Sequence, residues 1–295
     1  MASSNKGVSI IRHRDLEPSW HVPGAKVGGT LRSLISWVGG PKGYVNSNPG
    51  TAVENNEIGV GLMYLPVGQQ QEGLHYHTVT EIYLILKGFV EGKDGSGTNH
   101  RAGPMDCVYI PPGVPHGVRN CGLEDVELVW LHDGLERKGA TVYCDTEEDV
   151  KNAPSKEPVK VVSLRDLEPF WGAPRAKEPE FLRWMVNWIG GPAGFENLNR
   201  GVAVESEKIA LGLTVLYPGQ KQVPHQHAVA EVYTILQGKA LIKLDNKNQE
   251  LGYLDAVYFP PGHIHSLRNI GPDPVYIMWT HGRASPQKGV GIYRL

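Results

Sequence analysis

The chain contains two copies of one pattern, about 150 residues apart, and this duplication constrains the fold more than any other feature. The segment Arg14-Asp15-Leu16-Glu17-Pro18 returns as Arg165-Asp166-Leu167-Glu168-Pro169, and Trp130-x-His132 returns as Trp279-x-His281. The repeated segments extend through both halves of the chain. Self-similarity over this length predicts two domains with the same architecture.

A polar stretch separates the two copies. Residues 145–158 are acidic, contain two prolines and offer few apolar side chains to a core. Such a composition is typical of a linker. We therefore expect a first domain over residues 1–148, a linker over 149–157 and a second domain over 158–295. Each domain is long enough to bury its own core.

Each copy is composed mainly of strand-like runs. Residues 58–65 and 209–216 are rich in aliphatic side chains and are followed at once by turn residues. The 36 glycines and 22 prolines suit many short strands joined by tight turns. No long helical periodicity appears, and we expect only short helical turns near residues 31–38 and 180–188. The pattern predicts an all-β chain with one closed or sandwich-like jelly-roll barrel in each half.

Both copies carry three histidines and one glutamate in the same order. In a strand, an HxH pair and a glutamate four residues later lie on one face, because successive side chains alternate. A further histidine arrives from a distant strand after a Pro-Pro-Gly turn. Three neutral imidazoles and one carboxylate suit Fe(II), Mn(II), Ni(II), Co(II) or Zn(II), with up to two ions per chain. The predicted ligands are His75, His77, Glu81 and His116, and then His225, His227, Glu231 and His265.

These residues also carry a family resemblance. The segments His75-x-His77-x3-Glu81-x6-Gly88 and Pro111-x-Gly113-x2-His116-x3-Asn120 resemble the two motifs of the cupin superfamily, and the second half repeats them. The resemblance implies a bicupin, with two tandem cupin barrels of quercetinase-like or oxalate decarboxylase-like architecture. It also implies a metal site in each barrel.

Two details depart from the family pattern. The glycine that opens the second motif is replaced by Met105 in one half and by Leu254 in the other. The interval before the HxH pair is also one residue longer in the first half than in the second. Neither change removes a predicted ligand.

Two arginines are candidates for binding substrate. Arg32 and its repeat Arg183 could hold a substrate carboxylate through two parallel hydrogen bonds. Ion pairs with Glu54 and Glu205, which repeat in step with the arginines, are the alternative.

Four other side chains are candidates for lining the site. Tyr83 and Tyr233 share the parity of the glutamate ligands, so they face the barrel interior. Met63 and Leu65 would supply an apolar wall for a hydrophobic substrate. Packing in a filled barrel core is the alternative for all four.

Two further pairs repeat beside the ligands. His132 and His281 end a strand in each half, where they could support the metal ligands or transfer protons, or be ordinary strand-end histidines. Asn120 and Asn269 share the parity of the last histidine ligand. We expect them to fix the turn or that histidine by hydrogen bonding.

Composition excludes several kinds of partner. The net charge is −2 and no run of Lys or Arg occurs, which argues against nucleic acid and anionic membrane. No apolar run is long enough to span a membrane. The first residues lack the apolar stretch of a secretory signal, so we expect a cytoplasmic protein. The three cysteines have no CxxC spacing, which argues against a thiolate metal site.

Three functions remain compatible with these residues. The favoured one is a non-haem dioxygenase that uses O2 on a small phenolic or enolic substrate, in which Glu81 or Glu231 would also serve as a base. The alternative is a redox-neutral isomerase, lyase, decarboxylase or hydrolase acting on a keto acid or sugar-derived substrate. A non-catalytic storage or sensor protein is the third, and complete ligand sets argue against it. The duplication leaves both a monomer and a homo-oligomer open.

Overall fold

The computed structural model describes residues 7–39, 47–48, 51–55, 57–134, 141–190, 198–244, 247–282 and 292–293. The regular secondary structure of these residues is almost entirely strand, so the all-β prediction is confirmed. The chain divides into two compact units. Unit 1 runs from Leu16 to Leu164, and unit 2 combines the segment that ends at Asp15 with the chain from Arg165 onward. Among the described helices, none has the length and apolar character needed to cross a membrane.

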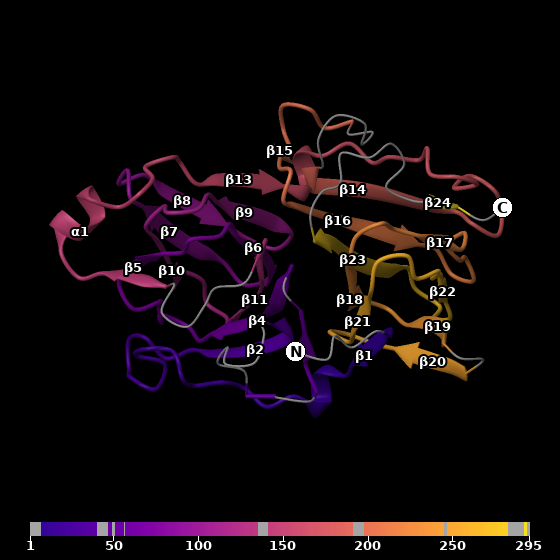
Figure 1. Cartoon of the computed structure of the whole chain (residues 1–295), viewed down its shortest axis with the longest axis horizontal. Coiled ribbons are helices and arrows are strands. Elements are labelled where there is room, and N and C mark those ends of the chain that lie inside the picture. The colour runs from indigo at the N-terminus through magenta and orange to yellow at the C-terminus, as the bar shows by residue number, and fades with distance from the viewer. Residues whose placement is uncertain are drawn as a thin grey trace. The chain divides into compact units, whose positions relative to one another are not determined.

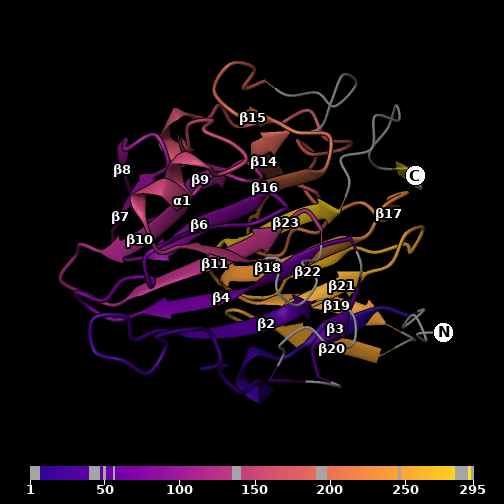
Figure 2. The ribbon, with the colours of Figure 1, turned by 60° about the vertical axis from the view of Figure 1, so that its left-hand side comes forward.

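Unit 1 is built from two sheets (Figure 1, Figure 2). The larger has the order β13 (Lys160–Ser163), β9 (Asp106–Ile110), β6 (Glu81–Lys87), β11 (Val126–His132), β4 (Gly59–Leu65), β2 (Ser33–Gly39) and β3 (Val53–Glu54). The smaller has the order β12 (Val142–Cys144), β5 (Leu74–Tyr76), β10 (His116–Asn120), β7 (Val90–Asp94) and β8 (Asn99–Ala102).

Unit 2 repeats this arrangement. Its seven-stranded sheet has the order β1 (Ser9–Ile11), β21 (Ala256–Phe259), β18 (Glu231–Gln237), β23 (Val275–Gly282), β16 (Ile209–Leu216), β14 (Arg183–Gly190) and β15 (Val204–Glu205). The remaining strands form the sheet β20 (Lys247–Leu251), β19 (Ala240–Leu244) and β22 (Leu267–Asn269), and the pair β17 (His225–Gln226) and β24 (Ile292–Tyr293).

The first strand of each repeat belongs to the unit formed by the other repeat. Strand β1 pairs antiparallel with β21 of unit 2, and its equivalent β13 pairs antiparallel with β9 of unit 1. Figure 1 shows the indigo β1 beside the orange β21. Arg12, directly after β1, forms an ion pair with Asp255 at 2.8 Å. The division therefore differs from the expected boundaries of 1–148 and 158–295. Strand pairing places β1 in unit 2 and β13 in unit 1.

The expected linker also contains regular structure. Helix α1 (Glu147–Lys151) overlaps its first residues. The Thr146 side chain accepts a hydrogen bond from the Asp149 backbone, and the Asp149 carboxylate accepts one from the Thr146 backbone. This reciprocal capping explains why so short and polar a segment forms a helix.

The predicted helical turns near residues 31–38 and 180–188 are wrong, because both segments form strands, β2 and β14. The register of β2 against β4 shifts between Ser36 and Val38, and that of β14 against β16 shifts between Asn187 and Ile189. Such a bulge interrupts the alternation of inward and outward side chains. The buried residues then no longer follow a period of two in the sequence.

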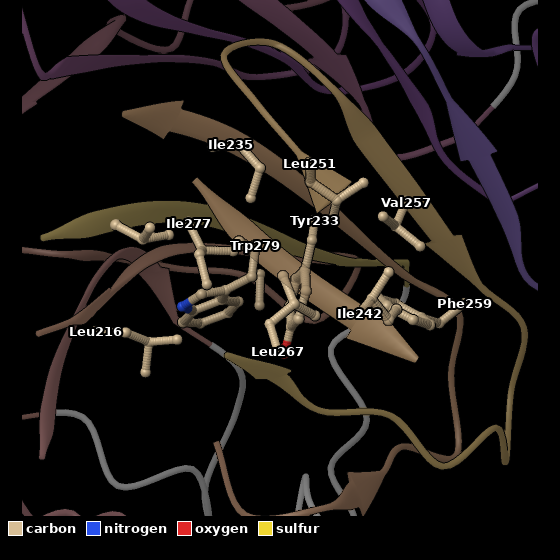
Figure 3. Close-up of a cluster of buried hydrophobic side chains, with 13 residues drawn as sticks. Leu216, Tyr233, Ile235, Ile242, Leu251, Val257, Phe259, Leu267, Ile277 and Trp279 are labelled. Carbon is tan, nitrogen blue, oxygen red and sulfur yellow. The ribbon is translucent and has the colours of Figure 1, made fainter. Parts of the chain in front are cut away.

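In the core of each unit, a tryptophan ring packs directly against a glycine of the neighbouring strand. Figure 3 shows the cluster in unit 2, where Trp279 packs with Leu216, Tyr233 and Ile277. A β-carbon on Gly212 would lie 2.1 Å from the Trp279 ring. The equivalent Gly61 has the same relation to Trp130 of unit 1, at 2.4 Å. Only glycine lets the strand approach the indole this closely.

The missing motif glycines correspond to strained turns. Met105 and Leu254 have φ values of 66° and 63°, in the left-handed region that glycine adopts most easily. The backbone N–H of Met105 donates to the Ile85 carbonyl at 2.8 Å, and that of Leu254 donates to the Ile235 carbonyl at 2.7 Å. The turn is thus held in the same shape without glycine.

The strand assignment leads to a stability prediction. Ile11 in β1 is fully buried, so Ile11→Ala should lower the free energy of unfolding of unit 2 by about 2–5 kcal/mol. Hydrogen exchange read by mass spectrometry should show lost protection in β21 and β18. Val162→Ala, in β13, is the matched change and should instead expose β9 and β6 of unit 1. Loss of protection in unit 1 caused by Ile11→Ala would contradict the assignment.

Candidate metal centres

The four predicted ligands of unit 1 meet inside the barrel. His75 lies in β5, Glu81 begins β6 and His116 begins β10, directly opposite His75 in the strand register. With His77, their ligating atoms all lie within 4.8 Å of one another, and all four residues are buried. The strand parity inferred from the sequence therefore places these side chains on one face.

Unit 2 assembles an equivalent cluster. His225, His227, Glu231 and His265 are buried, with ligating atoms within the same 4.8 Å of one another. His225 in β17 and His265, which precedes β22, again lie opposite each other in an antiparallel bridge. The two clusters are thus built by equivalent segments of each repeat.

One carboxylate lies at the centre of each cluster. In unit 1, Glu81 Oε2 is 2.6 Å from His116 Nε2 and 3.1 Å from His77 Nε2. In unit 2, Glu231 Oε2 is 2.8 Å from His265 Nε2 and 3.2 Å from His227 Nε2. Each glutamate therefore directs one oxygen at the histidines that share its barrel face.

The carboxylates are ionised despite their burial. Burial raises the pKa of Glu81, but the adjacent His77 and hydrogen bonds from neighbouring histidines lower that pKa further, to well below its usual value. For Glu231, burial again raises the pKa, but the adjacent His227 and His281 outweigh this effect and lower the pKa to well below its usual value. Both side chains can act as anionic ligands at neutral pH.

The first histidine ligand of each unit is held in its neutral form. Burial lowers the pKa of His75 well below its usual value, and the neighbouring His116 and His77 lower it further. Burial and His265 lower the pKa of His225 to about 3. A neutral imidazole offers a lone pair, which is the form that binds a metal ion.

A fourth histidine lies against the second carboxylate oxygen in each unit. His132 Nε2 lies 3.3 Å from Glu81 Oε1, and His281 Nε2 lies 2.9 Å from Glu231 Oε1. From the sequence alone, these histidines were compatible either with a supporting role or with an ordinary position at the end of a strand. Their position supports the ligand glutamates, which fixes the orientation of the carboxylates.

The donor atoms fit a divalent metal ion. His265 Nε2 and Glu231 Oε2 are buried and face each other at 2.8 Å, yet neither makes a hydrogen bond. Buried polar atoms that converge without hydrogen bonds are those that a bound cation would satisfy. Imidazole and carboxylate without thiolate match the expected ions. The prediction of a divalent metal in each unit is confirmed at this level.

A glutamine beside each cluster was not identified from the sequence. Gln71 Nε2 donates to the Tyr83 hydroxyl at 3.0 Å, and Gln222 Nε2 donates to the Tyr233 hydroxyl at 3.1 Å. The two glutamines precede the first histidine ligand by four and three residues, so the extra residue in the first half hid their equivalence. The tyrosines thus face the interior as expected, with their hydroxyls fixed by the protein.

The arginine candidates are buried next to backbone carbonyls. Arg32 donates to the carbonyls of Thr30 and Pro23 at 3.0 and 2.8 Å. Arg183 donates to the equivalent carbonyls of Phe181 and Pro174 at 3.2 and 3.1 Å. Of the alternative partners, Glu205 is exposed and the side chain of Glu54 lies outside the described residues.

The apolar candidates belong to the packed core. Met63 and Leu65 are 2% and 0% exposed and pack in one cluster with Ile85, Leu128 and Trp130. They therefore support the sheet that carries Glu81. Asn120 performs the expected turn-fixing role, because its amide donates to the Leu65 and Glu124 carbonyls, and Asn269 repeats this in unit 2.

The two clusters differ in one flanking side chain. Phe259 stacks on His265, with ring centroids 4.1 Å apart and an interplanar angle of 18°. The position opposite the glutamate in unit 1 is Ile110, as the strand registers show. The imidazole that ends the ligand set is thus held by an aromatic face in unit 2 only.

Comparison with protein families agrees with this architecture. Residues 61–132 and 212–281 each match the cupin domain family, and the two matched segments contain all eight predicted ligands. The chain is a bicupin of the cupin superfamily.

Curated relatives of this bicupin align with part of the chain. An uncharacterised protein of Methanocaldococcus jannaschii is 35% identical over 83 residues, which cover 28% of this chain and 62% of that protein. Dimethylsulfoniopropionate lyase DddQ of Ruegeria pomeroyi is 30% identical over 93 residues, which cover 32% of this chain and 46% of the lyase. The bicupin therefore spans less than two thirds of the length of either relative.

Solved structures resemble the bicupin over its whole length. An oxalate decarboxylase of Lactobacillus farciminis in a formate complex has a TM-score of 0.63 and 14% identity, covering 99% of this chain and 90% of that chain. A Bacillus subtilis oxalate decarboxylase has a TM-score of 0.62 and 17% identity, covering 99% and 80%. Another structure of the Bacillus enzyme is described by its Mn(II) centres. At this level of identity the likeness shows the fold.

Separate clusters lead to a prediction of metal stoichiometry. His75→Ala combined with His77→Ala should remove one equivalent of metal per chain and leave the second cluster filled. Elemental analysis of the purified protein measures this directly. The matched pair, His225→Ala with His227→Ala, should also remove one equivalent. Loss of both equivalents from either pair would show that the clusters do not load independently.

Metal binding should also stabilise the fold. A ligand present at a hundred times its Kd, and bound only by the folded state, adds about 2.7 kcal/mol. Chelation should therefore lower the thermal midpoint by several degrees, which differential scanning calorimetry detects. A chain with all four HxH histidines replaced by alanine is the control and should not respond to the chelator. An unchanged midpoint after verified metal removal would contradict this coupling.

Proposed function

We propose that this bicupin is a metal-dependent decarboxylase or related lyase that acts on a small keto acid or sugar-derived acid without net oxidation. The observation that carries this proposal is the polar surroundings of the first cluster. Gln71, Tyr83 and the buried cation Arg32 adjoin the ligands, and Arg32 is near enough to affect the pKa values of His75 and Tyr83. Such groups suit a small anionic substrate better than an aromatic one.

The favoured dioxygenase has weaker support than this alternative. An aromatic substrate would need Met63 and Leu65 as apolar walls of the site, but both side chains are fully packed in the core. The oxalate decarboxylases share the fold over the whole chain, and the partial relative DddQ is a lyase. Intact ligand sets in both units argue against a storage protein.

The residues around the cluster would divide the work of binding and orientation. A divalent ion bound by the histidines and the glutamate would supply Lewis acidity to a substrate oxygen. Arg32, and Arg183 in unit 2, would attract the substrate carboxylate, because a buried positive charge acts through a weakly screening medium. Burial raises the pKa of Tyr83 well above its usual value, and the nearby Glu81 carboxylate raises it further. Tyr83 therefore stays protonated and helps to orient Glu81.

The partners of the protein follow from the same argument. A small-molecule substrate is the proposed partner, whereas the use of O2, assembly into a homo-oligomer and a cytoplasmic location remain predictions. The roles of Glu81 and Glu231 as metal ligands that also act as a base are likewise part of this proposal.

The test measures product and oxygen together. Protein reconstituted with Mn(II), Fe(II) or Zn(II) is given 2-oxo acids, dicarboxylic acids and sugar acids, with product followed by NMR and dissolved O2 by electrode. We expect turnover of an acid without net O2 consumption, and loss of turnover in the chain without its HxH histidines. Consumption of one O2 per turnover with a phenolic or enolic substrate would overturn the proposal in favour of the dioxygenase.

A further inference from the structure

A short strand brings a tyrosine to the first metal cluster. Strand β12 pairs antiparallel with β5, and its central residue Tyr143 lies opposite the ligand His75. The two rings are 5.6 Å apart between centroids, with an interplanar angle of 36°. On the same segment, Thr141 Oγ1 lies 3.5 Å from Nδ1 of the ligand His77. Residues 141–144 thus run along the strand that supplies the HxH pair.

Arg32 holds the hydroxyl group of this tyrosine. Its guanidinium donates to two backbone carbonyls and also forms a side-chain hydrogen bond with Tyr143. An arginine has donors only, so the tyrosine oxygen must accept this bond. The hydroxyl proton of Tyr143 therefore points away from the guanidinium.

The arginine is built into the unit, whereas the tyrosine reaches the surface. Arg32 is only 4% exposed and is anchored by the Thr30 and Pro23 carbonyls. Tyr143 is half-buried. A fixed cation that bonds a hydroxyl oxygen polarises that hydroxyl and makes it a stronger hydrogen-bond donor.

The second half repeats the strand pairing. Strand β24 pairs with β17 so that Tyr293 lies opposite His225, as Tyr143 lies opposite His75. Arg183 occupies the position equivalent to Arg32 and donates to the equivalent carbonyls. A tyrosine therefore lies opposite the first histidine ligand in the strand register of both units.

We propose that Tyr143 is a substrate-binding residue of unit 1, which donates a hydrogen bond from its hydroxyl to a carboxylate oxygen of the substrate. Arg32 is the positioning residue that sets the direction of this hydroxyl. This inference deepens the proposed function and rests on it for the class of ligand. The substrate carboxylate would then be recognised by a residue of β12, a strand that carries no metal ligand.

The first test uses Tyr143→Phe, which removes one oxygen atom. Pyruvate and malonate are titrated calorimetrically into Mn(II)-loaded protein that carries His225→Ala and His227→Ala, so that only the first cluster is occupied. Loss of a hydrogen bond to a charged group should weaken binding about ten- to hundredfold. Metal content and the thermal midpoint should stay unchanged. Tyr64→Phe is the matched control, because the Tyr64 hydroxyl bonds Asp125 on the surface, and it should bind as the parent does.

A double-mutant cycle tests the role of Arg32. If Arg32 acts through Tyr143, the losses caused by Arg32→Lys and Tyr143→Phe should not add in the double variant. Additive losses would show that the arginine binds the carboxylate by itself and would overturn its positioning role. The cycle is measured on chains that hold one full equivalent of Mn(II). If Arg32→Lys loses metal, the inference is tested by Tyr143→Phe alone.

The outcomes separate this inference from the proposed function. Unchanged binding by metal-loaded Tyr143→Phe, or no binding of either acid by the parent, would overturn the inference. Weaker binding by Tyr143→Phe in a chain that turns over no acid would leave the inference standing and remove the proposed function. Turnover of an acid with unchanged binding and KM in Tyr143→Phe would support the proposed function and overturn the inference.

Discussion

The buried glutamate in each unit is the constraint on which the rest of the site depends. An ionised carboxylate removed from water costs several kcal/mol unless partners compensate for it. In unit 1 the compensation comes from His77, His116 and His132, which belong to three separate segments of the barrel. The strands that carry these histidines must therefore pair in the observed register to bring the imidazoles to the carboxylate. The metal centre and the barrel are consequently specified by the same side chains.

Strand parity made most of this site predictable. The HxH pair and the glutamate four residues later lie on one face, and the repeat confirmed the pattern within a single sequence. The helical turns near residues 31–38 and 180–188 were wrongly predicted, because a bulge in β2 and another in β14 break the alternation from which strands are identified. Which unit receives β1 and β13 was also beyond the sequence, since a repeat shows equivalence and does not show pairing.

The side chains next to the ligands were the hardest to predict. Gln71 and Gln222 repeat, but at different distances from the first histidine. Tyr143 lies in a three-residue strand whose only signal is its partner across the ladder. Arg32 was identified as a candidate, but its contacts with the Thr30 and Pro23 carbonyls depend on the path of a loop. Groups positioned by non-local pairing leave no periodic trace in a sequence.

The exchange of first strands also determines when each unit can be completed during synthesis. Ser9 in β1 pairs with Tyr258 in β21, which the ribosome makes nearly 250 residues later. At roughly 5–20 residues per second, this interval lasts roughly 12–50 seconds. Throughout that time Ile11 has no sheet to enter, although it is among the most deeply buried residues of the finished protein. A nascent chain that stalls before β21 therefore presents an apolar, unpaired strand edge to the chaperones and other chains around it.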